Sequence, residues 1–292
     1  MNRDFAGRGL AVLTTITIAA TTTDTSLWLA LVIGLGLSHY LLSFYYAAPK
    51  IKFLVTSRAH QLSGVTLLAT GVMLFFTKFP LAIFFGVHHA FNEGYLRRFA
   101  APSEPSAEPV GAARALLHGF GYLVVIRHEA ALKNIPEILL WTGLAMAAAF
   151  YWRALRPDKN TSHTPAIASS SAELLLALVI LLSLQIEISW LHVVFYHFAL
   201  WAIHPILGLS KQGSAALTEY FALTIGSLLG FFLLTTTKLA SDFLDMAFWY
   251  GQFYFWSYIH IATSLALSNA HPAWIVRLFQ PTAHNRPSNV AK

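Results

Sequence analysis

Thirteen histidines are the most unusual feature of this 292-residue chain, because Asp, Glu, Lys and Arg together make up only 11% of it. An ionisable side chain inside an apolar segment is costly to bury and usually marks a functional position in the interior of a membrane protein. Neutral imidazole is a good ligand for Fe, Cu or Zn. The histidines inside long apolar stretches are His39, His88, His89, His118, His192, His197, His204 and His260.

Four of these histidines lie in four separate apolar segments: His39, His88, His197 and His260. A single one is explained by a hydrogen bond to a neighbouring helix, whereas four together are better explained by one shared metal ion. Side chains on facing helices build such sites in the core of a helical bundle. The sequence therefore predicts a metal centre.

Spacing narrows the choice of ligands in segment 190–205. His192 and His197 are five residues apart, about 140° around a regular helix, so they share one ion only across a local π-bulge or rotation. His197 and His204 are seven apart, about 10 Å along the helix axis, and cannot both bind one ion. His204 precedes Pro205 near a helix end, which favours a capping or interfacial role.

The predicted catalytic residues are His39, His88 and His197. The predicted metal ligands are these three and His192, with His89, His260 and His204 as further candidates. Glu93 follows His88 by five residues and is a candidate ligand or an acceptor for an imidazole N–H. An equally good interpretation pairs Glu93 with Arg97, four residues later on the same helix.

The elements that must position these residues are membrane helices. The chain is 56% hydrophobic, and its charged fraction is less than half of the roughly 25% that soluble chains carry, so lipid must surround much of it. A spanning helix needs about 20 mostly apolar residues. The candidate spans are 9–23, 26–48, 61–79, 81–96, 112–127, 135–155, 172–206, 217–238 and 246–268.

Segment 172–206 is too long for one straight span, and it is either one tilted helix or two helices with a break near Ser189. The predicted fold is therefore all-α, a polytopic transmembrane bundle of about eight to ten helices. We expect a single integral membrane domain over 1–292, with tails at 1–8 and 272–292 and loops at 99–111 and 156–171.

Composition also excludes several classes of site and partner. Cysteine is absent, which excludes disulfides, zinc–thiolate sites, iron–sulfur clusters and cysteine nucleophiles. The net charge of +6 comes from basic residues between apolar runs, as in membrane-protein loops, and no nucleic-acid partner is expected. Loops with Lys50, Arg98 and Arg153 fall on one side when helices are counted from a cytoplasmic N-terminus, which agrees with the positive-inside rule.

The order and spacing of the histidines resemble the Brp/Blh family of membrane-bound β-carotene 15,15′-dioxygenases. The family's first motif is Gly-Leu-Pro-His-Gly-x-x-Asp, and the stretch from Gly36 to Ser43 is similar at its Gly, Leu and His. The second is His-Phe-Gly-x-x-Asp, and here His88 is followed after five residues by Glu93. His118-Gly119 matches a later His-Gly pair.

The third motif of the family is His-x-x-x-His, about 110 residues after the second. His197 falls at that distance, but Trp201 stands at the place of its partner, and Ser43 replaces the first motif's Asp. A late histidine in the final span resembles His260. By this resemblance, Glu93 and His118 would support the metal ligands.

This resemblance implies a non-haem Fe(II) dioxygenase that uses O₂ to cleave a β-carotene-like carotenoid into retinal-like aldehydes. It also implies a lipophilic substrate taken from the bilayer, and residence in a bacterial inner (cytoplasmic) membrane. Three other classes remain open: a lipid desaturase or hydroxylase, a haem-binding electron carrier with bis-histidine ligation, and a metal-free transporter with a His/Glu proton relay.

Overall fold

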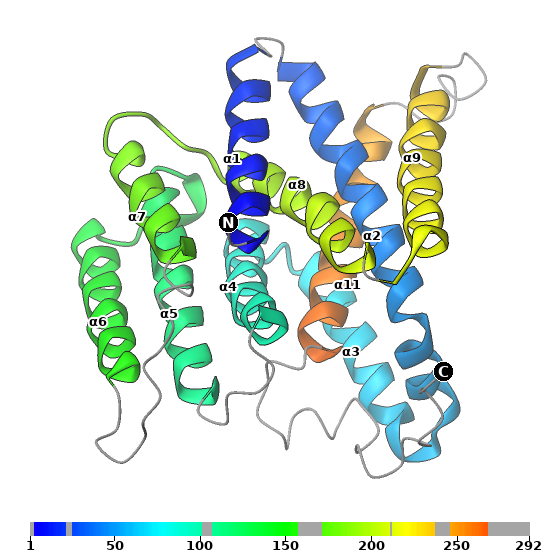
Figure 1. Ribbon diagram of the computed structural model, residues 1–292, viewed down its shortest axis with the longest axis horizontal. Coiled ribbons are helices and arrows are strands. Elements are labelled where there is room, and N and C mark those ends of the chain that lie inside the picture. Colours follow the sequence, from blue (N-terminus) through cyan, green and yellow to red (C-terminus); the bar gives the residue numbers. More distant parts are fainter. Residues whose placement is uncertain are drawn as a thin grey trace.

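All regular structure in the described part of the chain is helical (Figure 1). The computed structural model describes residues 3–21, 25–100, 107–156, 171–210, 212–236 and 246–267. Its helices are α1 (Arg3–Thr21), α2 (Thr25–Thr56), α3 (Arg58–Phe76), α4 (Leu81–Ala100), α5 (Ala107–Val125), the 3-10 helix η1 (Ala130–Leu132), α6 (Glu137–Leu155), α7 (Ser171–Ser183), α8 (Trp190–Leu209), α9 (Ser214–Thr236) and α11 (Met246–Leu267). The all-α prediction is confirmed for these ranges.

Within the described ranges, three helices are long and apolar enough to cross a membrane: Leu27–Thr56, Glu137–Leu155 and Ser214–Leu233. The last two bury little of their apolar surface inside the protein. In Figure 1 they belong to α6 and α9, which lie at opposite edges of the molecule. Because water does not favour such apolar outer faces, these helices indicate that the chain associates with a membrane.

The long apolar segment 172–206 consists of two helices. α7 ends at Ser183 and α8 begins at Trp190, and the break between them includes Ser189. The alternative of one continuous tilted helix is therefore wrong.

Two predicted boundaries also need correction. The predicted tail 1–8 is mostly helix, because α1 begins at Arg3. The predicted loop 99–111 is shorter, because α4 continues to Ala100 and α5 begins at Ala107. Pro109 lies in the first turn of α5, where a missing backbone N–H costs nothing. Residues 157–170 and the predicted tail 272–292 lie outside the described ranges.

The core forms where α2, α4, α8 and α11 meet. α11 packs against α2, α3 and α4, and α8 runs obliquely across the molecule in contact with α1, α2 and α9 (Figure 1). Gly36 permits one close approach, because a Cβ at this position would lie 2.6 Å from Phe253 Cε2 and 3.0 Å from Phe198 Cε2. α2 therefore lies directly against aromatic rings of α8 and α11.

Candidate metal centre

Three histidines from three distant helices meet in this core. His39 of α2, His88 of α4 and His197 of α8 each offer a ring nitrogen, and these nitrogens all lie within 4.8 Å of one another. The ring centroids are 5.0 Å apart for His88 and His197, and 5.3 Å apart for His39 and His197. His88 and His197 are buried and His39 is partly buried. These are the three residues that the sequence analysis selected as catalytic.

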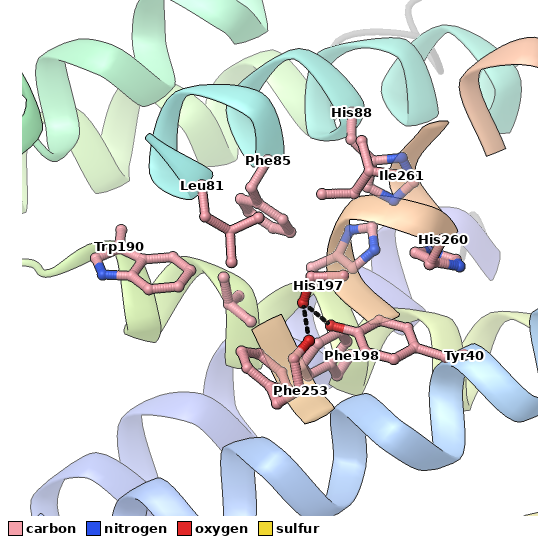
Figure 2. Close-up of a pocket in the computed structure, with 12 residues that line it drawn as sticks. Tyr40, Leu81, Phe85, His88, Trp190, His197, Phe198, Phe253, His260 and Ile261 are labelled. Carbon is pink, nitrogen blue, oxygen red and sulfur yellow. Dashed lines mark hydrogen bonds between the residues drawn. The ribbon is translucent and has the colours of Figure 1, made fainter. Parts of the chain in front are cut away.

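His260 of α11 adds a fourth imidazole. Its Nε2 lies 3.2 Å from His39 Nε2, and its ring centroid lies 5.1 Å from that of His88. The ring is buried. Figure 2 shows His88, His197 and His260 on three different helices around one small cavity. Four helices thus contribute one histidine each to a single group, which we call the four-histidine cluster (His39, His88, His197 and His260).

Hydrogen bonding leaves part of this cluster unsatisfied. The Asn92 side-chain amide, one helical turn after His88, lies 2.9 Å from His88 Nε2 and fixes that ring. His197 Nε2 is buried and has no hydrogen-bond partner among the described residues. Buried polar atoms are rarely left unpaired, and such an atom calls for an explanation, for example an ion. His197 therefore has a nitrogen available as a metal ligand.

A hydrogen bond beside the cluster joins α2 to α11. The Tyr40 hydroxyl and Ser257 Oγ lie 2.7 Å apart, and Ser257 Oγ also donates to the Phe253 carbonyl at 2.6 Å. These are the dashed lines in Figure 2. Tyr40 directly follows His39, and Ser257 stands three residues before His260. The bond between them therefore fixes the relative position of α2 and α11 at the point where their histidines meet.

Cavities lie on both sides of the cluster. The smaller, with a volume of only about 10 Å³, is lined by aromatic side chains together with His88, His197 and His260 (Figure 2). The larger, of about 310 Å³, is lined by His39, His88, His260 and Trp201 together with several polar side chains. His88 and His260 line both. The cluster thus forms the partition between two cavities, and each has access to its imidazoles.

A second buried polar group adjoins the first. His89, Glu93 and His118 bring ligand atoms within 4.8 Å of one another, and the ring centroids of His89 and His197 are 6.1 Å apart. Both carboxylate oxygens of Glu93 are engaged by Arg8 of α1, each at 2.8 Å. Arg97, the alternative partner considered for Glu93, has a side chain outside the described residues. Glu93 is thus neutralised by a cation from another helix.

The second group continues into α5 and α7. Arg114 Nε lies 2.5 Å from Glu173 Oε1, and His118 Nε2 lies 3.9 Å from the same oxygen. The network therefore joins α1, α4, α5 and α7. Arg8, Arg114 and Glu173 were not predicted as site residues, because each stands near the end of an apolar run, where charged residues usually face the lipid headgroups. Pairing across helices is not visible in local spacing.

The remaining predicted ligands lie outside the four-histidine cluster. His192 Nδ1 accepts the Ser189 backbone N–H at 3.2 Å and lies 2.7 Å from Ser189 Oγ. Its ring lies 5.3 Å from Trp28. α8 is a regular helix with no π-bulge, so His192 and His197 diverge as the helical period requires. His204 lies beside Trp201, with centroids 5.9 Å apart, and joins neither group.

No family model, curated protein or solved structure matches this chain. The function must therefore be argued from the geometry of the site and from the motifs of the sequence. Both point to the four-histidine cluster as the candidate metal centre.

Proposed function

We propose that this protein is a membrane-embedded oxygenase that holds a non-haem Fe(II) with His39, His88, His197 and His260. Its proposed reaction is the cleavage of a carotenoid-like polyene by O₂ to two aldehydes, as in the Brp/Blh family. The observation that carries the proposal is the convergence of four imidazoles from four helices in a buried core.

Interatomic distances support a metal at the cluster. Metal–imidazole bonds of about 2.1 Å place two neighbouring ligand nitrogens about 3.0 Å apart at a right angle and about 3.4 Å apart in a tetrahedron. The Nε2 atoms of His39 and His260 are 3.2 Å apart. A hydrogen bond between these two rings would also give that distance, but it would leave His197 Nε2 without a partner. One shared ion satisfies all three rings.

The ligand type favours oxygen chemistry. The four-histidine cluster contains no carboxylate and no thiolate, so an Fe(II) bound there keeps its positive charge. When bound, Fe(II) with neutral nitrogen ligands and an open position supplies the binding and activation of O₂. Asn92 and the Tyr40–Ser257 bond hold the imidazoles in place, and buried aromatic side chains cover one side of them.

The aromatic wall of the smaller cavity supports an apolar substrate. Phe85, Phe198 and Phe253 line the smaller cavity, whose volume of about 10 Å³ has to widen before a substrate can enter. The larger cavity, with polar side chains in its lining, lies on the other side of His88 and His260. A rod-shaped polyene that passes the histidines would be held by burial of its apolar surface, which contributes about 25 cal/mol for each Å² removed from water. Such a molecule dissolves in the bilayer, which gives the enzyme a reason to reside there.

We infer further that the ten described α-helices form a polytopic bundle in a bacterial inner membrane. The apolar outer faces of α6 and α9 support this, and shorter apolar segments occur in α1, α3, α5 and α7. The basic residues between the apolar segments agree with a cytoplasmic N-terminus.

A haem held between His39 and His260 is disfavoured by their distance. Two axial nitrogens on opposite faces of a haem iron are separated by about 4 Å, twice the metal–nitrogen bond, and a porphyrin must fit between them. The 3.2 Å between His39 and His260 leaves no room for the ring. A visible spectrum of the purified protein without a Soret band is the expected outcome.

The proposal is tested by expression in a bacterium that accumulates β-carotene. The wild-type chain should bleach the pigment and produce aldehydes, and His88→Ala should do neither. His128→Ala is the matched control, because His128 is exposed and lies outside the cluster, and it should behave as wild type. Unchanged pigment in cells that contain iron-loaded wild-type protein would exclude β-carotene as the substrate.

A further inference from the structure

A third cavity, larger than the two beside the four-histidine cluster, opens between α1, α7 and α8, and none of the four cluster histidines lines it. It has a volume of about 500 Å³ and is lined mainly by aliphatic side chains, such as Val12, Leu176 and Val179. Ile16, Leu182 and Ile186 also line it and are about half exposed, at 51%, 45% and 58%. These apolar residues on the outer surface indicate a mouth that faces the lipid.

The inner end of this cavity is polar. Arg8, His89, Glu93 and His118 line it, and all four are buried. His118 is 3% exposed, and its Nε2 has no hydrogen-bond partner among the described residues. The Glu173 oxygen at 3.9 Å is beyond hydrogen-bonding distance. A buried imidazole nitrogen in this situation can donate to or accept from a ligand oxygen.

The charges around this inner end balance. Arg8 is paired with Glu93, and Arg114 with Glu173, so two cations face two anions. A carboxylate or phosphate head would bring an uncompensated negative charge into this buried place, which is costly. An alcohol or aldehyde head brings no charge and needs only one hydrogen bond.

We propose that this cavity binds a long apolar molecule from the bilayer whose head is a single uncharged oxygen group, a hydroxyl or an aldehyde. The apolar chain lies between α1 and α7, and the head meets His118 beside the Arg8–Glu93 pair. This site is separate from the four-histidine cluster, and binding here requires no metal and no turnover.

The test uses two photoactivatable probes with the same chain, a long-chain alcohol and the corresponding carboxylic acid, each carrying a diazirine. The full-length protein in lipid nanodiscs is irradiated with either probe, and the labelled peptides are identified by mass spectrometry. The alcohol should label α1, α7 and α8, and should outcompete the acid roughly tenfold. Equal labelling by the acid, or labelling spread over the outer surface, would overturn the proposal.

Two substitutions test where the apolar tail and the head group of the ligand bind. Leu182→Trp fills the mouth and should abolish the labelling, whereas Leu181→Trp, on the neighbouring exposed residue that does not line the cavity, should leave it intact. His118→Leu should weaken alcohol binding about fivefold, the loss of one hydrogen bond, with His128→Leu as the control. Alcohol labelling in Leu182→Trp at the wild-type level would contradict the proposed position.

His88→Ala separates this proposal from the oxygenase. Labelling of the cavity by the alcohol should persist in that variant although iron and activity are lost. Loss of labelling in a folded His88→Ala protein would show that the molecule is held by the metal centre, and the separate site would be refuted.

Discussion

The Nε2 atoms of His39 and His260 lie 3.2 Å apart, although the two residues are separated by 221 positions in the sequence. This distance matches the separation expected for two neighbouring ligands of the proposed metal ion. This contact places His260 of α11 beside His39, which with His88 was predicted from motifs in the first half of the chain.

Removal of either ligand should reduce the metal content. If the proposed site is right, the purified wild-type protein should hold about one iron per chain, and His260→Ala or His197→Ala should weaken binding roughly tenfold or more, because each would remove a proposed ligand. Elemental analysis after dialysis measures this. His128→Ala should keep the wild-type content, and equal iron in all three variants would contradict a four-histidine site.

Trp201 offers a gain-of-function experiment. It lines the same cavity as His39, His88 and His260, and it is one helical turn after His197, with ring centroids 6.2 Å apart. A histidine at this position would point to the same side of α8 as His197. We therefore expect Trp201→His to restore iron binding to His260→Ala. The double variant should bind more iron than His260→Ala alone, and no recovery would place position 201 out of reach.

The close approach at Gly36 predicts a loss of stability. A Cβ there would lie 2.6 Å from Phe253 Cε2, and overpacking a tight core costs about 1–3 kcal/mol. Gly36→Ala should lower the free energy of unfolding, measured by SDS titration in mild detergent, and should also weaken iron binding because it displaces α2 from α11. Gly226→Ala is the matched control, since a Cβ at Gly226 would have no neighbour within 4 Å.

The Arg8–Glu93 pair predicts strong non-additivity. Both side chains are buried, at 2% and 1% exposure, so Arg8→Met alone leaves a buried carboxylate without its cation and should cost about 3–5 kcal/mol of unfolding free energy. Glu93→Met alone should cost a similar amount. The double variant should recover much of the loss, because no buried charge is left. Additive losses would show that the two residues stabilise the protein independently.

The sequence alone determined that the chain is helical and where most helices lie, because apolar length and charge content decide whether a segment is buried in lipid. It also selected His39, His88 and His197, because burying an imidazole in an apolar helix costs free energy and such residues usually have a function. Only the tertiary structure decided between His192 and His260: in the regular α8 His192 points away from His197 and bonds Ser189, while α11 brings His260 to His39.

The partner of Glu93 was likewise decided by the tertiary structure. Local spacing offered Arg97 on the same helix, but the cation that contacts both carboxylate oxygens is Arg8, 85 residues earlier in the chain. From the sequence one can predict helical periodicity and the free-energy cost of burying a residue, and both depend only on nearby residues. Which faces of distant helices meet depends on the packing of the whole bundle, and here small residues such as Gly36 allow the close approach that brings the four histidines together.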